Sequence, residues 1–105
     1  MKNRRNREII VAGMIEKIND EINIEIQDKF QMFEDGLRVE EFYKDDFETL
    51  KRLLQKDVEH FMKHLQIDDV IFLLELIDDK ITDAMWFILD QIINENNNDR
   101  KGVTT

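Results

Sequence analysis

Apolar side chains recur at helical spacing along the whole segment 68–95, and this pattern limits the fold more than any other feature of the sequence. The stripe consists of Val70, Leu74, Ile77, Ile81, Met85, Ile88 and Ile92. Steps of three and four residues place these side chains on one face of an α-helix. Asp79 or Thr82 could cap a fourth helix within 78–83. The stripe continues across that point, however, and favours a single long helix.

Two earlier segments carry the same spacing. In the segment 4–35 the stripe comprises Val11, Ile15, Ile18, Ile22, Ile26, Phe30 and Phe33, and in the segment 45–66 it comprises Phe47, Leu50, Leu54, Val58, Phe61 and Leu65. The 105 residues include no proline and only three glycines, which leaves few sharp turns and argues against an all-β fold. We therefore expect an all-α protein of three to four helices, at about 4–35, 45–66 and 68–95, in an antiparallel bundle.

Individual residues predict where these helices begin and end. Gly36 follows the first helix, at a position that tolerates a positive φ angle. Asp45 and Glu48 have the spacing of a capping box and predict the start of the second helix. Asp68 predicts the start of the third helix as its N-cap. Between the first two helices we expect a connector at 37–44.

The chain length favours one all-α domain at 1–95. The segment 96–105 is polar and rich in asparagine, and it predicts a flexible tail. Ile22, Ile24 and Ile26 alternate with polar residues, as they would in a strand. We still predict a helix there, because a lone strand would have no partner.

The predicted helices are long for a compact monomer. At 1.5 Å per residue, the first and third helices would span about 48 Å and about 42 Å. A compact chain of this size is only about 35 Å across. Either one helix is broken or the excess packs against a second chain, so we expect a homodimer that completes the bundle.

The opposite face of the third predicted helix carries aromatic residues among acids. This row, called the outer stripe below, consists of Asp68, Phe72, Glu75, Asp79, Asp83, Trp86, Asp90 and Asn94. The segment 67–95 holds one basic and eight acidic residues, or −7 of the chain's net charge of −9. Aromatic side chains are frequent anchors at interfaces, while acids attract basic surfaces and set the register. Apart from Asn94, the stripe residues are therefore the candidate contacts for another protein with a basic surface.

The two aromatic residues have an alternative interpretation. Phe72 and Trp86 could pack inside the chain or against a dimer mate, with the acids as a solvated rim. Leu76 and Phe87 flank the same side, so the helix could be apolar nearly all round, as a central helix is. On the first interpretation, the chain is a small acidic regulator, inhibitor or adaptor.

The N-terminus suggests a function of another class. Four basic residues there could contact phosphate groups: Lys2, Arg4, Arg5 and Arg7. No helix-turn-helix, ribbon or zinc module accompanies them, and they could simply begin the first helix. A further alternative is nucleic-acid mimicry, in which the acidic helix occupies the groove of a DNA-binding protein. A net charge of −9 is modest for a mimic.

The sequence contains no recognisable motif for a complete metal site or a catalytic centre. His60 and His64 lie four residues apart on the second predicted helix, with Asp57 on the same side, a spacing that can surround one ion. A di-iron bundle would need a second motif of this kind, and none occurs. Zero cysteine excludes thiol catalysis and Cys-ligated metals. We expect a non-enzymatic protein without a metal or cofactor.

The sequence also predicts a cytoplasmic protein. The apolar run 9–12 is too short for a signal peptide. The longest apolar stretches, 70–74 and 84–89, fall far below the roughly 18 residues that a membrane span needs. The absence of cysteine fits a reducing compartment.

Overall fold

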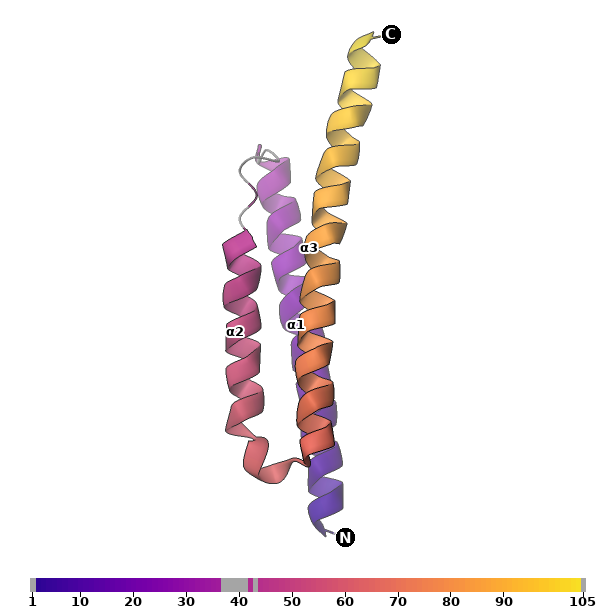
Figure 1. The fold of residues 1–105 in the computed structure, drawn as a ribbon. Helices are drawn as coiled ribbons and strands as arrows, with labels where there is room; N and C mark the ends of the chain where they lie inside the picture. Colours follow the sequence, from indigo (N-terminus) through magenta and orange to yellow (C-terminus); the bar gives the residue numbers. More distant parts are fainter. Residues whose placement is uncertain (1, 37–41, 43, 105) are drawn as a thin grey trace.

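Three long helices pack along one another (Figure 1). The computed structural model describes the backbone of residues 2–36, 42 and 44–104, and the burial of residues 5–36, 42 and 44–94. The elements are α1 (Lys2–Glu34), α2 (Lys44–His60), the short 3₁₀ helix η2 (Met62–His64) and α3 (Ile67–Thr104). The all-α bundle that the three apolar stripes predict is confirmed, and α3 continues without a break through 78–83.

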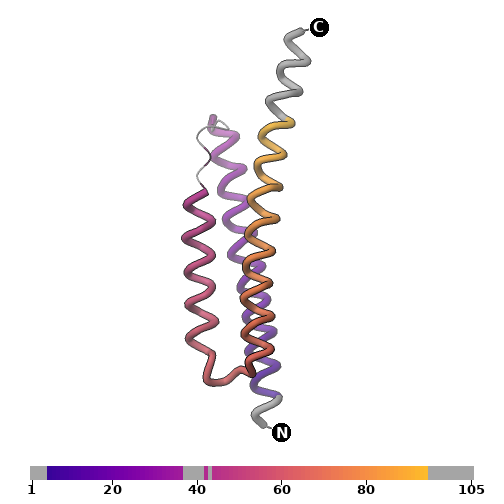
Figure 2. Tube along the Cα trace, viewed as in Figure 1, coloured from indigo at the N-terminus to yellow at the C-terminus, as the bar shows by residue number. Residues whose placement is uncertain are grey.

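The chain runs up, down and up again, so α2 is antiparallel to both α1 and α3, which are parallel to each other (Figures 1 and 2). Ion pairs tie each pair of helices: Lys17–Asp57 at 2.7 Å and Lys29–Asp46 between α1 and α2, Lys51–Asp78 at 2.5 Å between α2 and α3, and Arg7–Asp69 at 3.1 Å between α1 and α3. The hydrogen bond from Lys51 to Asp78 raises the pKa of Lys51, because the carboxylate stabilises the ammonium form.

The molecule is a rod rather than a sphere. Its principal extents are 66 × 20 × 19 Å, and its radius of gyration is 17.8 Å, against about 13 Å for a compact chain of similar length. The helices lie along the long axis, so their length fits within one chain. The geometric reason for expecting a second chain is therefore lost.

The core takes side chains from all three helices. The buried apolar residues are Met14, Ile18, Ile22, Phe47, Leu54, Val58, Leu73, Ile77, Ile81, Ala84, Ile88 and Ile92. Most belong to the predicted stripes, and Met14, Leu73 and Ala84 widen them. The remaining stripe residues, among them Val11, Leu50 and Val70, pack half-buried against this core. Burying one large side chain of this kind stabilises the fold by about 1.5–3 kcal/mol.

One charged side chain is fully buried within the described part of the chain. Lys29 of α1 is 0% exposed, and its ammonium pairs with Asp46 in the first turn of α2. Glu25, one helical turn earlier, lies 3.6 Å away. The pair fixes the start of α2 against α1. The sequence pattern did not predict it, because a lysine beside an apolar stripe ordinarily extends into water.

The predicted ends of the helices are partly correct. Gly36 adopts a φ angle of 113° in the turn that follows α1, which confirms its role in ending the helix. The capping role of Asp45 is wrong, because α2 already begins at Lys44 and Asp45 lies in its first turn. Asp68 likewise lies in the first turn of α3. The side chain of Asp69 instead accepts a hydrogen bond from the backbone N–H of Gln66, at 3.3 Å.

Two further boundaries differ from the prediction. We expected the second helix to end near Gln66, but α2 ends at His60. The chain turns through η2 so that Phe61 and Leu65 both reach the core before α3 starts. We expected the third helix to end near residue 95, but α3 continues to Thr104. The flexibility of 96–105 stays a prediction, and most of the expected connector, 37–41 and 43, lies outside the described residues.

Candidate functional site

The outer stripe lies on the solvent side of α3. All eight of its residues are exposed, and the aromatic side chains of Trp86 and Phe72 are 64% and 48% exposed. Packing of these two rings inside the chain is therefore wrong. The helical period explains this placement, because the stripe is half a turn away from the buried residues around Ile77 and Ile88. The stripe thus presents two large apolar anchors to water.

The acids of the outer stripe are not neutralised by the chain itself. Asp68, Glu75, Asp79, Asp83 and Asp90 form no ion pair with any other described residue. By contrast, their neighbours Asp69 and Asp78 pair with Arg7 and Lys51. The structure thus separates structural acids, which join helices, from a row of carboxylates whose field extends into solvent.

The order of acidic and aromatic residues in the outer stripe is the same in both directions along the helix. Residues equidistant from Asp79 have the same character: Glu75 and Asp83, Phe72 and Trp86, Asp68 and Asp90. If two copies paired antiparallel through this face, each acid would meet an acid. Parallel pairing in register gives the same result. The stripe is therefore poorly suited to self-association at neutral pH, because like charges placed opposite one another repel.

A small hollow lies beside Trp86, where α2 begins against α3. Its volume is about 230 Å³, and it is lined by Lys44, Glu48, Thr82, Met85, Trp86 and Leu89. Met85 and Leu89 are half-buried. The hollow offers an apolar recess next to the most exposed ring of α3, large enough for one side chain of a partner.

Of the four basic residues at the N-terminus, the structure describes the side chains of Arg5 and Arg7. Arg7 pairs with Asp69 across α1 and α3, and only about a quarter of its side chain is exposed. Arg5 is exposed on α1, and the side chains of Lys2 and Arg4 lie outside the described residues. Arg7 thus joins α1 to α3, and a phosphate contact by these residues stays a prediction.

The histidine pair does not share a helical face. α2 ends at His60, and His64 lies in η2 after the turn at Phe61, so the predicted spacing on one helix is wrong. The ring of His60 packs edge-on against Phe61 at 5.0 Å. Asp57 accepts a hydrogen bond from Lys17 and raises the pKa of that lysine. Among the described residues, no three histidine or acidic side chains are grouped to hold a metal ion.

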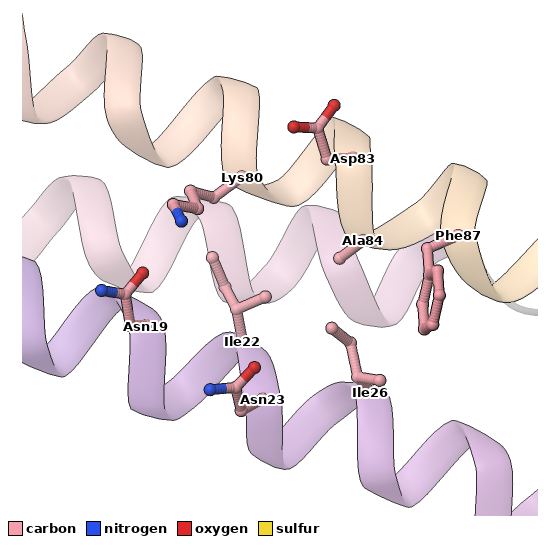
Figure 3. A pocket seen from close by; sticks show the side chains of 8 residues that line it. All are labelled: Asn19, Ile22, Asn23, Ile26, Lys80, Asp83, Ala84 and Phe87. Atoms are coloured by element: carbon pink, nitrogen blue, oxygen red, sulfur yellow. The ribbon is translucent and has the colours of Figure 1, made fainter.

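A groove between α1 and α3 was not predicted. Figure 3 shows it lined by Asn19, Ile22, Asn23 and Ile26 of α1 and by Lys80, Asp83, Ala84 and Phe87 of α3. Its volume is about 450 Å³. The exposed ring of Phe87 closes one end, and Lys80 extends toward Asn19 at the other. The only sequence signal was that Phe87 and Leu76 share a side of α3. The groove arises from two helices, so no single periodicity could find it.

Comparison with known proteins adds no relative: no family model, curated protein or solved structure matches this chain. Within the described residues, no helix combines the length and apolar character that crossing a bilayer requires.

Proposed function

We propose that this chain is a small, acidic, non-enzymatic protein that regulates, inhibits or links another protein by binding its basic surface. The observation that carries the proposal is the outer stripe, where Trp86 is 64% exposed in a row of acids that form no ion pair with another described residue. A soluble chain gains nothing in stability from a large ring left in water. When a partner covers such a ring, the burial of apolar surface stabilises the complex.

The two kinds of side chain have separate roles in this proposal. Phe72 and Trp86 supply the buried contact area, and the hollow beside Trp86 receives an apolar side chain of the partner. Asp79 and its neighbouring acids attract the basic surface and fix its register, mainly by raising the rate of association. Binding therefore weakens as salt is added.

We also propose that the protein works as a homodimer in the cytoplasm. Large apolar side chains remain exposed away from the outer stripe, among them Ile9, Ile24 and Phe87. Contact with a second copy would cover part of this surface. The absence of cysteine supports a reducing compartment.

The proposed contact face can be tested with a synthetic, helix-forming peptide of lysine and leucine, its leucines spaced to meet Phe72 and Trp86. Fluorescence anisotropy of the labelled peptide measures the affinity. We expect Trp86→Ala to weaken binding about tenfold or more, as loss of an anchor does. We expect the pair Asp79→Asn and Asp90→Asn to weaken binding and to reduce its dependence on salt.

Two controls separate the face from general effects. Leu53→Ala removes a comparably exposed apolar side chain from α2, and the pair Asp28→Asn and Glu59→Gln removes the same charge from exposed positions on α1 and α2. Both should bind like the unaltered protein. Equal losses in the controls and the stripe variants would contradict the proposal, and so would a Trp86→Ala protein that unfolds.

A further inference from the structure

The groove between α1 and α3 has a different character from the outer stripe. Its rim carries opposite charges, Lys80 and Asp83, and neither forms an ion pair with another described residue. Ile22 and Ala84 lie buried at its base, and the half-buried Ile26 supplies apolar surface. The ring of Phe87 packs edge-on against Phe30 at 5.7 Å, yet it remains 48% exposed. The groove is therefore a nearly neutral surface with an uncovered aromatic edge.

We propose that a second copy of this chain packs against the face that carries this groove, with α1 antiparallel to α1 and α3 antiparallel to α3, about a two-fold axis level with the midpoint between Lys80 and Asp83. The inference rests on the proposed dimer, and of the outer stripe it uses Asp83 alone. In a two-fold interface, residues equidistant from the axis along antiparallel helices face one another. Lys80 then faces Asp83 of the second copy, and this pair occurs twice. One turn further out, Leu76 faces Phe87.

The same symmetry is present in α1. Asn19 and Asn23 both line the groove and are equidistant from Glu21. In an antiparallel pair they face each other, and their amides can each donate and accept hydrogen bonds. Ala12 and Phe30 are also equidistant from Glu21, so a small side chain meets a large ring.

The two symmetry centres coincide in height. Residues 19–26 of α1 line the groove beside residues 80–87 of α3. Counting along the two parallel helices, Glu21 is level with the midpoint of Lys80 and Asp83 to within about one residue, roughly 1.5 Å. A single two-fold axis therefore relates both α1 and α3 to their copies. A symmetric pattern that arose by chance on one helix would not have to match the height of the pattern on the other.

Charge decides which face the second copy takes. Self-pairing through the outer stripe opposes acid to acid, whereas pairing through the groove opposes Lys80 to Asp83. A closed two-fold contact needs a surface that complements itself. Trp86 lines the hollow between α2 and α3 and not this groove, so its ring stays available to a different partner.

Charge reversal tests this assignment on the full chain without any partner. Lys80→Asp alone and Asp83→Lys alone each place like charges opposite one another in both pairs. We expect each variant to dimerise about tenfold more weakly, or worse, in sedimentation equilibrium. The double variant restores both pairs and should recover the dimer. An equimolar mixture of the two single variants should form a heterodimer.

Matched controls are Lys56→Asp and Asp28→Lys, which make the same charge changes at exposed positions on α2 and α1. Both variants should dimerise like the unaltered chain. Trp86→Ala should do so as well. If the unaltered chain is a monomer at about 100 µM, the dimer itself is wrong. If the chain dimerises but neither single variant weakens the dimer, the assignment of the interface to the groove is wrong, although the proposal of a dimer is still supported. Peptide binding at the outer stripe is measured separately, so its failure is distinguishable from both.

Discussion

At the scale of single residues, the buried Lys29 is the least expected feature. Its ammonium is 0% exposed and is held by Asp46, while Glu25 lies 3.6 Å away. Asp46 itself is about half exposed, so only one partner of the pair has lost its water. Desolvating a charge is costly, and the gain from pairing often does no more than balance that cost. The pair therefore positions α2 more than it stabilises the bundle.

We expect Lys29→Met to leave the free energy of unfolding unchanged or to raise it by about 1 kcal/mol, because a side chain of similar volume replaces the buried charge. Asp46→Asn should lower it by about 1–3 kcal/mol, since it leaves the ammonium buried with Glu25 alone. Urea denaturation followed by circular dichroism measures both values. A larger loss in Lys29→Met than in Asp46→Asn would show that the ion pair is a net source of stability.

At the scale of helices, two glycines have opposite effects on α1. Gly36 takes a φ angle of 113° just after the helix, while Gly13 lies inside it, and a Cβ at Gly13 would meet no atom within 4 Å. A residue with a side chain is strained at positive φ but favoured over glycine within a helix.

We expect Gly36→Ala to destabilise the fold by about 1 kcal/mol and Gly13→Ala to stabilise it by about 0.5–1 kcal/mol. For a domain of about 100 residues, 1 kcal/mol moves the melting temperature by about 4–8 °C. Differential scanning calorimetry of the two variants should therefore show shifts of opposite sign. Shifts of the same sign would mean that Gly36 does not take a positive φ angle after α1 in solution.

The sequence predicted the helices better than their ends. The three stripes of apolar residues located α1, α2 and α3, because a period of 3.6 accumulates over many residues. The ends depend on single contacts. Asp45 and Asp68 have the right chemistry for caps, but each helix begins one residue earlier. The turn at Phe61 depends on where the next helix must start, which no local pattern encodes.

At the scale of the molecule, the rod shape and the proposed groove contact lead to a prediction for solution scattering. The symmetry axis lies near the middle of the 66 Å length, so an antiparallel dimer lies side by side. We expect the largest dimension to grow little on dimerisation while the cross-section widens. End-to-end association through an overhanging helix would instead lengthen the particle. Small-angle X-ray scattering over a concentration series distinguishes the two.

The candidate site was predictable in part. The outer stripe follows from one helical period, so its exposure could be expected from Phe72 and Trp86 lying opposite Ile77 and Ile88. The groove could not be expected, because it needs the relative height of α1 and α3. That height is set by packing contacts such as the edge-on meeting of Phe30 and Phe87.

A partner helix lying along α3 meets the same order of charges whichever way it points, because the acids are mirrored about Asp79. Electrostatic attraction brings such a helix to the face but does not determine in which direction it binds along α3. Among the mirrored pairs the two rings differ most, since indole is larger than phenyl and carries an N–H donor. For the partner that we propose, the difference between Trp86 and Phe72 therefore decides the direction of binding. A face with the same ring at both positions would accept this partner in either direction.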